Sequence, residues 1–431
     1  MKLYTYPSAD AQARVKSIID RGLGFSQTDY DQVLGYITDV RTRGDQALVA
    51  YTNRFDSSAV TLDTFRVSEA EFEQALASVD SAFLNTLDRA ILQLTQFHEK
   101  QRQNAWIDTP RNGVMVGQLV RPVDAAGIYV PGARGGKTPL VSSVLMGGIP
   151  AKVAGVSTTV LMTPPMENGC VNPHILAAAA KLGITSVFKA GSAWAIAALA
   201  YGTDQVPKVD VIVGPGNIYV TLAKKIVAGT VGIDMIAGPS EILIIADSTA
   251  DPEFVAADLL SQAEHDAMAS AILVTDSRQL ADRTTEALER QLNALPRQET
   301  ARQSLDHFGA ILVVPDIATA IDLSNQLAPE HLELMVDSPF DHIDRIRNAG
   351  ALFLGHYTPE PMGDYIAGPN HVLPTAGTAR FSSALNLEHF TKKTSLIHYS
   401  RQAFQNEADD VIRLAQIEGL TAHANSVKVR K

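Results

Sequence analysis

The residues Ser261-Gln262-Ala263-Glu264-His265 end a helical pattern and carry side chains that could bind a metal. Asp251 and Pro252 are typical of the N-cap and first position of a helix, and apolar residues follow at helical spacing. Gln262 and His265 are three residues apart, so both side chains can reach one point. An amide oxygen and a neutral imidazole suit a borderline cation such as zinc. Taken alone, this stretch is better interpreted as a polar helix end, where a histidine gains from the helix dipole.

Composition excludes several classes of protein. The sequence has 431 residues, enough for two or three domains, and a net charge of −11, which provides no basic surface for nucleic acid or anionic membranes. Cys170 is the single cysteine, so any metal ligands must be His, Asp, Glu or Gln. The sequence has no apolar run of the ~20 residues that cross a membrane, and the N-terminus lacks a signal-peptide core. We therefore expect a cytoplasmic enzyme.

A second candidate for chemistry is the dipeptide Glu330-His331, at a boundary between a loop and a strand. Its side chains could act as a general base and a second acid–base group. Adjacent residues of an extended chain point to opposite sides, so a shared site requires a bend; a solvated pair is the usual alternative. Ser240, within Ala237–Glu241, lies between two βα series and could orient a substrate or form a turn.

Two glycine-rich loops each follow a strand and precede a helix. In Val130–Pro139 a proline stands where a P-loop requires its first glycine, so a P-loop is disfavoured. We expect Thr138 and Pro139 to begin a helix there, beside a ligand phosphate or as a surface turn. In Gly214-Pro215-Gly216-Asn217, Asn217 could cap a helix or bind a ribose. The GxGxxG fingerprint is absent from the sequence, so any dinucleotide site is non-standard.

Three polar residues near the C-terminus could also contribute. Glycines expose Asp364, a potential hard oxygen ligand, whereas His371 could be a ligand or a packing residue. His423 follows Gly419, which ends a long helical pattern. It would have to reach the site from a tail, so a partner subunit could complete the active site; otherwise it is a surface histidine.

Alternating strand and helix patterns must position these residues. We expect a helix over 28–52, a strand near 65–67 and a capping box from Ser68 to Glu71. Two series of strands follow, at 127–130, 158–162, 186–189 and 209–213, and then at 241–247, 271–276, 310–314, 332–336 and 351–354. They predict two doubly wound parallel sheets with ligands at the carboxyl ends of the strands. After residue 384 the sheet pattern stops and a helix over 402–418 is expected.

Five strings in this order resemble the histidinol dehydrogenase family, and the similarity extends from Asp39 to Val427. The strings are Gly127–Gly132, Gly214–Asn217, Ala237–Glu241, Ser261–His265 and Pro329–Leu332. The resemblance implies an α/β fold of two incomplete Rossmann-like domains in an intertwined homodimer. It also implies oxidation of L-histidinol to L-histidine through an aldehyde, in histidine biosynthesis, with two NAD⁺ and one zinc ion per subunit.

The resemblance also assigns roles to residues. His331 would be the general base for the alcohol proton, and Glu330 would activate the water that adds to the aldehyde. The implied zinc ligands are Gln262, His265, Asp364 and His423. The implied substrate pocket contains Ser240, Gln262, His265, His331, Asp364, Glu418 and His423.

The implied NAD⁺ site contains one departure from the family pattern. Tyr129 and Asn217 match, but Trp194 stands where the family usually has glutamine. An indole can stack on the cofactor but has one donor and no acceptor. The stretch Arg134–Lys137 carries two cations that could touch a phosphate.

We divide the chain into four parts: an N-terminal arm over 1–24, a first α/β domain with the zinc and substrate site over 25–103 and 238–383, a second α/β domain on the NAD side over 104–237, and a C-terminal tail over 384–431 that completes the site of the partner subunit. The main alternative function is a relative that oxidises another small alcohol, such as a hydroxy-sulfonate. A metallohydrolase would not need Tyr129 or Asn217, and a structural metal protein would not need Glu330-His331.

Overall fold

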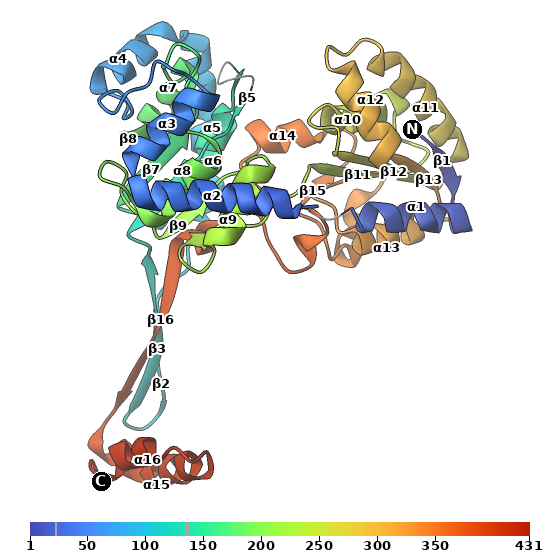
Figure 1. The fold of residues 1–431 in the computed structure, drawn as a ribbon. Helices are drawn as coiled ribbons and strands as arrows, with labels where there is room; N and C mark the ends of the chain where they lie inside the picture. The colour runs from blue at the N-terminus through green and yellow to red at the C-terminus, as the bar shows by residue number, and fades with distance from the viewer. Residues whose placement is uncertain (22–23, 134–137) are drawn as a thin grey trace. The chain divides into compact units, whose positions relative to one another are not determined.

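The computed structural model describes residues 1–21, 24–133 and 138–431, so the predicted phosphate contact of Arg134–Lys137 lies outside the described residues. The chain forms two compact units: a larger one of residues 1–100 and 124–390, and a smaller one of residues 101–123 and 391–431 (Figure 1). Parallel sheets belong to the larger unit and an antiparallel sheet to the smaller one. Among these residues, no helix is long and apolar enough to cross a membrane.

The first sheet of the larger unit has six parallel strands in the order β1-β13-β12-β11-β14-β15. They are β1 (Leu3–Thr5), β11 (Glu241–Ala246), β12 (Ser270–Thr275), β13 (Ala310–Val313), β14 (His331–Met335) and β15 (Ala351–Leu354). From β11 the chain adds β12 and β13 on one side, and then β14 and β15 on the other. The strand order therefore reverses between β11 and β14, where Ile242 lies opposite His331.

Helices cover both faces of this sheet, as the prediction of a doubly wound sheet requires. One face carries α1 (Ala9–Ile19) and α13 (Ile317–Leu327), and the other carries α10 (Pro252–Ala263), α11 (Arg278–Leu292) and α12 (Gln298–Phe308). Asp251 caps α10 by accepting a hydrogen bond from the Glu253 N–H, which confirms the predicted start of that helix. Because β1 and α1 are part of this sheet and its cover, residues 1–21 do not form a separate arm.

The second sheet of the larger unit has five parallel strands in the order β10-β9-β4-β7-β8. They are β4 (Ala125–Tyr129), β7 (Thr158–Thr163), β8 (Ser186–Lys189), β9 (Val211–Val213) and β10 (Gly232–Ile233). Here the chain begins at β4, adds β7 and β8 on one side, and then β9 and β10 on the other. The strand order reverses between β4 and β9.

The second sheet is packed with helices from two parts of the chain. From the N-terminal region come α2 (Gln27–Arg43), α3 (Asp45–Phe55), α4 (Glu69–Ser78) and α5 (Ser81–Glu99). From the segments that follow its own strands come α6 (Val141–Ala154), α7 (Pro173–Leu182), α8 (Ser192–Tyr201) and α9 (Ile218–Val227). The apolar residues Val33 and Ile37 of α2 share a core with α8 and α9, while α4 and α5 pack on α7 and α6. The contacts thus differ from the expected division, which joined residues 25–103 to 238–383.

Two local predictions are wrong for backbone reasons. The expected helix over 28–52 is broken at Gly44, whose φ of +55° ends α2. Thr138 and Pro139 do not begin a helix, because they form β6 (Thr138–Pro139) and pair with β5 (Gly132–Ala133). The capping box of Ser68 and Glu71 is confirmed.

The smaller unit is an antiparallel ribbon with a helical pair. Its elements are β2 (Trp106–Arg111), β3 (Val114–Pro122), β16 (Thr391–Tyr399), α15 (Arg401–Ile417) and α16 (Thr421–Lys428). The strand β16 corrects the expectation that strands stop after residue 384. Its side chains are mostly exposed, so it lacks the apolar alternation by which strands are predicted.

The remaining elements of the larger unit are short. They are α14 (Glu360–Tyr365) and the 3₁₀ helices η1 (Pro339–Arg345), η2 (Thr378–Arg380) and η3 (Leu387–Phe390).

Candidate functional site

His331 and Glu330 lie where β14 begins, and both are tied to the neighbouring strand β11. The Glu241 main-chain N–H donates to Glu330 Oε2 at 2.9 Å, and His331 Nδ1 lies 2.8 Å from the Glu241 carbonyl oxygen. Glu330 Oε2 is 3.8 Å from His331 Nδ1, so the adjacent side chains share one site. The pair stands at the amino end of the strands, where the switch-point pattern predicted the carboxyl end.

The hydrogen bond of His331 fixes which nitrogen can accept a proton. A carbonyl oxygen can only accept, so Nδ1 carries the hydrogen and the neutral ring keeps its lone pair on Nε2. Nε2 is buried and has no hydrogen-bond partner within the described residues. Burial lowers the pKa of His331 to about 4, so the imidazole is neutral at neutral pH.

Glu330 is buried with its carboxyl group against other acids. Burial raises its pKa well above the ordinary value, the Glu241 N–H opposes this rise, and the charges of Glu241, Asp364 and Glu360 add to it. A cation bound nearby would act in the opposite direction and favour the carboxylate.

The end of α10 supplies two of the predicted metal ligands. Gln262 is buried, and its Oε1 has no hydrogen-bond partner in the part of the chain that the structure describes. His265 follows the helix end, and its Nδ1 lies 2.8 Å from the Ser261 carbonyl, which leaves Nε2 with the lone pair. Both side chains therefore present an acceptor atom of the kind that a metal binds.

Asp364 brings a carboxylate to the same site from α14. His331, Glu360 and Asp364 each offer a ligand atom, and these atoms lie within 4.8 Å of one another. His331 Nε2 is 3.8 Å from Glu360 Oε1, but burial raises the pKa of Glu360 to about 9. At neutral pH this contact joins a neutral ring to a protonated carboxyl group and is not an ion pair.

His371 is part of this cluster as well. Its Nε2 is buried without a hydrogen-bond partner among the described residues, and burial lowers its pKa. Asp364 and His265 both influence this pKa electrostatically, and His371 and His265 influence the pKa of His331. The structure thus brings His331, Glu360 and Asp364 together, and His265 and His371 lie near enough to act on this cluster electrostatically.

Sequence reasoning missed a set of buried acids that supports this cluster. Glu333 lies two residues after His331 on β14 and accepts the Glu360 N–H at 2.8 Å, which anchors the start of α14. Asp258 of α10 hydrogen-bonds Glu333, and burial raises the pKa of both carboxyl groups. A signal existed, because Glu333 is an acidic residue flanked by the apolar residues Leu332 and Leu334 in a buried strand.

The predicted cofactor residues lie at the carboxyl ends of β4 and β9, beside the switch point of the second sheet. Tyr129 is buried, and its hydroxyl accepts the Ser192 N–H at 3.0 Å. Asn217 caps α9 by accepting the N–H groups of Tyr219 and Val220. This is the position where doubly wound sheets bind dinucleotides.

Gly214 allows the second sheet's loop to approach Tyr129 closely. Its φ is +118°, and a Cβ at this position would lie 2.1 Å from the Tyr129 carbonyl oxygen. A glycine is therefore required at this residue.

Trp194 lies in the core of the second sheet's helical layer. Its ring stacks on Phe55 with centroids 5.2 Å apart and meets Tyr51 and Tyr36 at 5.5 Å. It is 4% exposed, and Nε1 is buried with no hydrogen-bond partner within residues 1–21, 24–133 and 138–431. Its role toward the cofactor stays a prediction.

Of the other predicted substrate residues, Ser240 belongs to the larger unit, whereas Glu418 and His423 belong to the smaller one. Ser240 is half-buried directly before β11, and its carbonyl accepts the Ser270 N–H at 2.9 Å. Glu418, the C-cap of α15, and His423, on α16, belong to the smaller unit and are exposed there.

Comparisons with known proteins identify the family. The family model described as histidinol dehydrogenase matches residues 25–431. The chain is 55% identical to histidinol dehydrogenase of Desulfotalea psychrophila over 426 residues, covering 98% of each chain, and 52% identical to that of Carboxydothermus hydrogenoformans, covering 93% of each. A crystal structure of histidinol dehydrogenase from Elizabethkingia anophelis superposes with a TM-score of 0.93 at 41% identity, over 100% of this chain and 98% of that one. The chain therefore belongs to the histidinol dehydrogenase family and is an oxidoreductase of that type in histidine biosynthesis.

Proposed function

We propose that this enzyme oxidises L-histidinol to L-histidine by two hydride transfers to NAD⁺, with one zinc ion per subunit. The observation that carries the proposal is His331: a buried, neutral imidazole whose Nδ1–H is bonded to a carbonyl and whose Nε2 has no hydrogen-bond partner among the described residues, so it can accept a proton. Family membership supplies the substrate, and curated relatives of the same function favour it over another small alcohol.

The donor set fits a zinc ion. Gln262 Oε1 is a buried acceptor without a hydrogen-bond partner in the described chain. With it, His265 adds a second neutral ligand and Asp364 adds an anionic one. We assign Gln262, His265 and Asp364 as ligands, together with His423 of α16. When bound, the ion would act as a Lewis acid that anchors the polar groups of the substrate.

In the first half-reaction, His331 Nε2 accepts the alcohol proton as the hydride leaves the carbinol carbon for the nicotinamide. The Glu241 carbonyl stabilises the imidazolium that forms, because it accepts the Nδ1–H. Protonation of a buried ring is unfavourable, and Asp364 offsets part of this cost electrostatically. Release of this proton to solvent restores the neutral base.

In the second half-reaction, water adds to the aldehyde and the resulting gem-diol yields the second hydride. Glu330, ionised in the loaded site, would remove a proton from the attacking water and pass it to the former carbonyl oxygen, which becomes the second hydroxyl of the gem-diol. His331 then again takes the hydroxyl proton as hydride leaves. The 3.8 Å between Glu330 Oε2 and His331 Nδ1 supports their action on one bound substrate.

The second sheet would hold NAD⁺ between the carboxyl ends of β4 and β9. The support is the strand-order reversal there, the close approach allowed by Gly214 and the helix N-terminus at Asn217. We assign Tyr129 and Asn217 to the cofactor, and retain Trp194 as a residue that shapes the site from the core.

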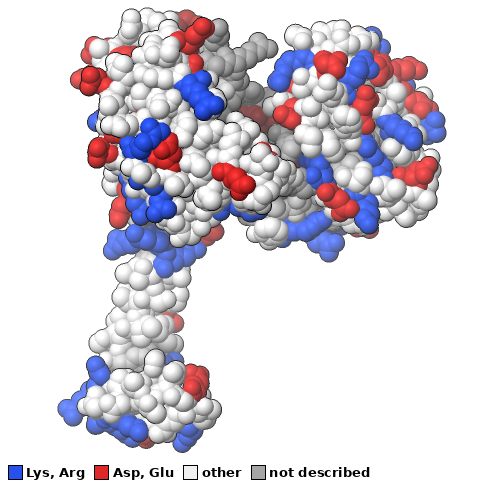
Figure 2. All heavy atoms as spheres, viewed as in Figure 1, with Lys and Arg blue, Asp and Glu red and all other residues white. Residues whose placement is uncertain are grey.

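A homodimer is supported by the apolar surface of the smaller unit. Several large apolar side chains are exposed there: Trp106, Ile107, Ile397, Leu414, Ile417 and Val429. Figure 2 shows few charged side chains along the ribbon strands on the face in view. Large apolar side chains exposed on a surface with few charges favour a protein interface. We propose that a second copy covers it, and that His423 and Glu418 complete the partner's site.

The test is NADH formation from L-histidinol by purified, zinc-loaded protein, with the product quantified. We expect two NADH per histidinol and histidine as the product, and loss of activity with a chelator. Zinc and NAD⁺ binding without NADH from histidinol would favour a different alcohol substrate. Hydrolysis without any NAD⁺ reduction would favour a metallohydrolase.

A further inference from the structure

Glu241, the first residue of β11, contacts both proposed acid–base residues through three separate groups. Its main-chain N–H donates to Glu330 Oε2, its carbonyl accepts from His331 Nδ1, and its carboxylate Oε2 accepts the Glu330 N–H at 3.3 Å. The side chain thus holds the same dipeptide that its main chain orients. The Glu241 carboxylate pairs with Arg21, and the residue contacts His331 at Nδ1 and not at the proposed proton acceptor Nε2, so we do not place its side chain against the substrate.

Arg21 anchors the Glu241 carboxylate from the other side. Arg21 Nη2 lies 2.5 Å from Glu241 Oε1, and the Ala376 N–H donates to the same oxygen at 3.2 Å. The guanidinium also donates to the carbonyls of Pro239 and Met268, so its position is fixed by three partners. The Arg21 side chain is 3% exposed and that of Glu241 12%, so the ion pair is screened little by solvent.

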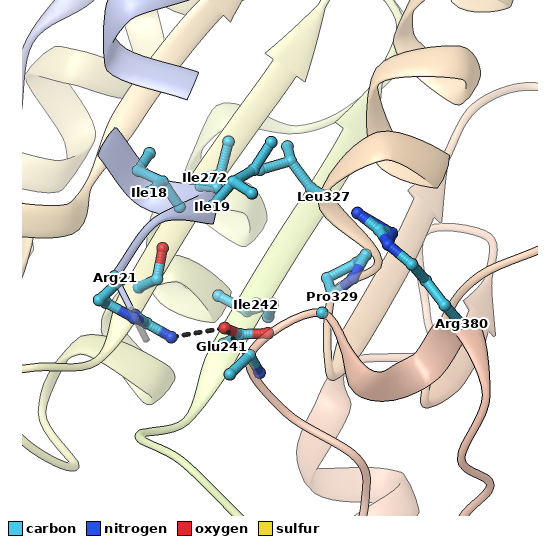
Figure 3. Close-up of a pocket in the computed structure, with 12 residues that line it drawn as sticks. Ile18, Ile19, Arg21, Glu241, Ile242, Ile272, Leu327, Pro329 and Arg380 are labelled. Carbon is cyan, nitrogen blue, oxygen red and sulfur yellow. Dashed lines mark hydrogen bonds and ion pairs between the residues drawn. The ribbon is translucent and has the colours of Figure 1, made fainter. Parts of the chain in front are cut away.

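A cavity of about 160 Å³ borders this ion pair, and Figure 3 shows Arg21, Glu241 and Arg380 along its wall. Arg380 donates to the carbonyls of Asn325 and Gln326, so both guanidinium groups already have partners in the chain. The open space gives the Glu241 side chain room to rotate away from Glu330. Removal of Arg21 would leave a buried, uncompensated carboxylate, which would move toward the cavity or take up a proton.

We propose that Glu241, held by Arg21, is a positioning residue that fixes the orientation of Glu330 and His331. The inference rests on the proposed acid–base roles of that pair. Arg21, which lies in the predicted N-terminal arm over 1–24, thereby becomes part of the support of the proposed active site. Because positioning acts on the bound transition state, loss of the ion pair is expected to lower kcat more than it raises KM.

Four variants of the full-length, zinc-loaded enzyme test this. Glu241→Gln keeps the size of the side chain but points an NH₂ group at one of three N–H donors, and we expect kcat to fall about 10- to 100-fold with KM for histidinol within about twofold. Arg21→Met should lower kcat about tenfold, and Arg21→Lys, which keeps the charge, should recover most of that loss. Arg380→Met is the matched control, since it removes a guanidinium from the same cavity, and its kcat should equal that of the wild type.

Zinc content and crystal structures of the variants are determined together with their activity. We expect unchanged zinc and, in Glu241→Gln, a displaced Glu330 carboxyl group or a rotated His331 ring. An unchanged kcat with unmoved Glu330 and His331 overturns the inference, and so does an equal effect of Arg380→Met. If Glu241→Gln does not fold, the Arg21 pair of variants decides.

Failure of the proposed function can be distinguished from failure of the positioning role. Wild-type protein that forms no NADH from histidinol contradicts the proposed reaction, and the displacement of Glu330 or His331 in the variant structures then judges the positioning role separately. An active wild type with a fully active Glu241→Gln contradicts only the positioning role.

Discussion

The two sheets of the larger unit have the same design but use opposite ends of it. Each is a parallel sheet whose strand order reverses once, between β11 and β14 in the first and between β4 and β9 in the second. In the first sheet the polar cluster stands at the amino ends, and it consists of buried acids and imidazoles such as Glu330 and His331. In the second sheet the candidate residues stand at the carboxyl ends and are neutral: Tyr129, Gly214 and Asn217.

Under the proposed function, this difference gives the two sheets different tasks. Buried titratable groups can move protons, whereas main-chain N–H groups and a glycine loop at a switch point bind a large ligand with little charge of their own. The topology is shared, so the chemistry follows from which side chains stand at the strand ends and how deeply they are buried.

The largest effect is expected for His331→Asn in the first sheet. Loss of the proton acceptor should lower kcat about 10²- to 10⁴-fold, the range of general-base catalysis. Zinc should stay bound, because His331 is not an assigned ligand. Steady-state kinetics and metal analysis measure both quantities, with the exposed His307→Asn as the control. Loss of zinc in the His331 variant would contradict the assigned role.

Asp364→Ala tests the metal assignment of the first sheet. Removal of the one assigned carboxylate ligand should weaken zinc binding at least about 100-fold, more than loss of an outer-shell partner does. Competition with a chelator measures the affinity, and Asp341→Ala in η1 is an exposed control. His423→Ala should lower zinc content as well. Full zinc occupancy in both variants would rule out the four-ligand assignment.

Gly214→Ala tests the second sheet. A Cβ there would collide with the Tyr129 carbonyl at 2.1 Å, so the loop must shift, with a cost of about 1–3 kcal/mol in stability and weaker NAD⁺ binding. Gly229→Ala is the matched control, since it also has a positive φ (+93°) but nothing within 4 Å of the added Cβ. Calorimetry measures NAD⁺ affinity, and zinc content should not change. Equal NAD⁺ affinity in both variants would remove the loop from the cofactor site.

The smallest effect concerns Asp56, a carboxyl group that influences Tyr129 in the second sheet. Burial raises the pKa of Asp56 to about 6, above the unfolded value of about 3.9. The folded state therefore binds this proton more tightly, and the resulting stabilisation is full below about pH 4 and lost as pH rises through about 6. Asp56→Asn should reduce the pH dependence of the free energy of unfolding over this range. The exposed Asp63→Asn should keep the pH dependence of the wild type. A slope unchanged in Asp56→Asn would exclude the raised pKa.

Much of the fold was predictable from local patterns. The buried parallel strands appear as apolar runs, and Asp251 with Pro252 marks the start of α10. The capping box at Ser68 is equally local. Strand β16 was not predictable in this way, because a two-sided exposed ribbon has no buried face to impose alternation.

The packing of the N-terminal helices was also beyond the sequence patterns. An amphipathic helix such as α2 shows that it has a buried face but not which sheet covers that face, so its place on the second sheet could not be inferred. Conversely, residue type and family resemblance pointed to Glu330-His331 and to the end of α10 as the proposed site. The supporting roles of the acids Glu241 and Glu333 were missed, although each adjoins apolar residues of its strand.

The edge strand β1 has a consequence for how the chain is made. Leu3 pairs with Ile311, so this part of the first sheet cannot form until about 300 further residues have been synthesised. At 5–20 residues per second, the N-terminal segment waits roughly 15 to 60 s on the ribosome. The strands of the second sheet all emerge during that interval. Arg21 waits as well, so a nascent chain can complete its second sheet before the proposed acid–base pair of the first sheet has an anchor.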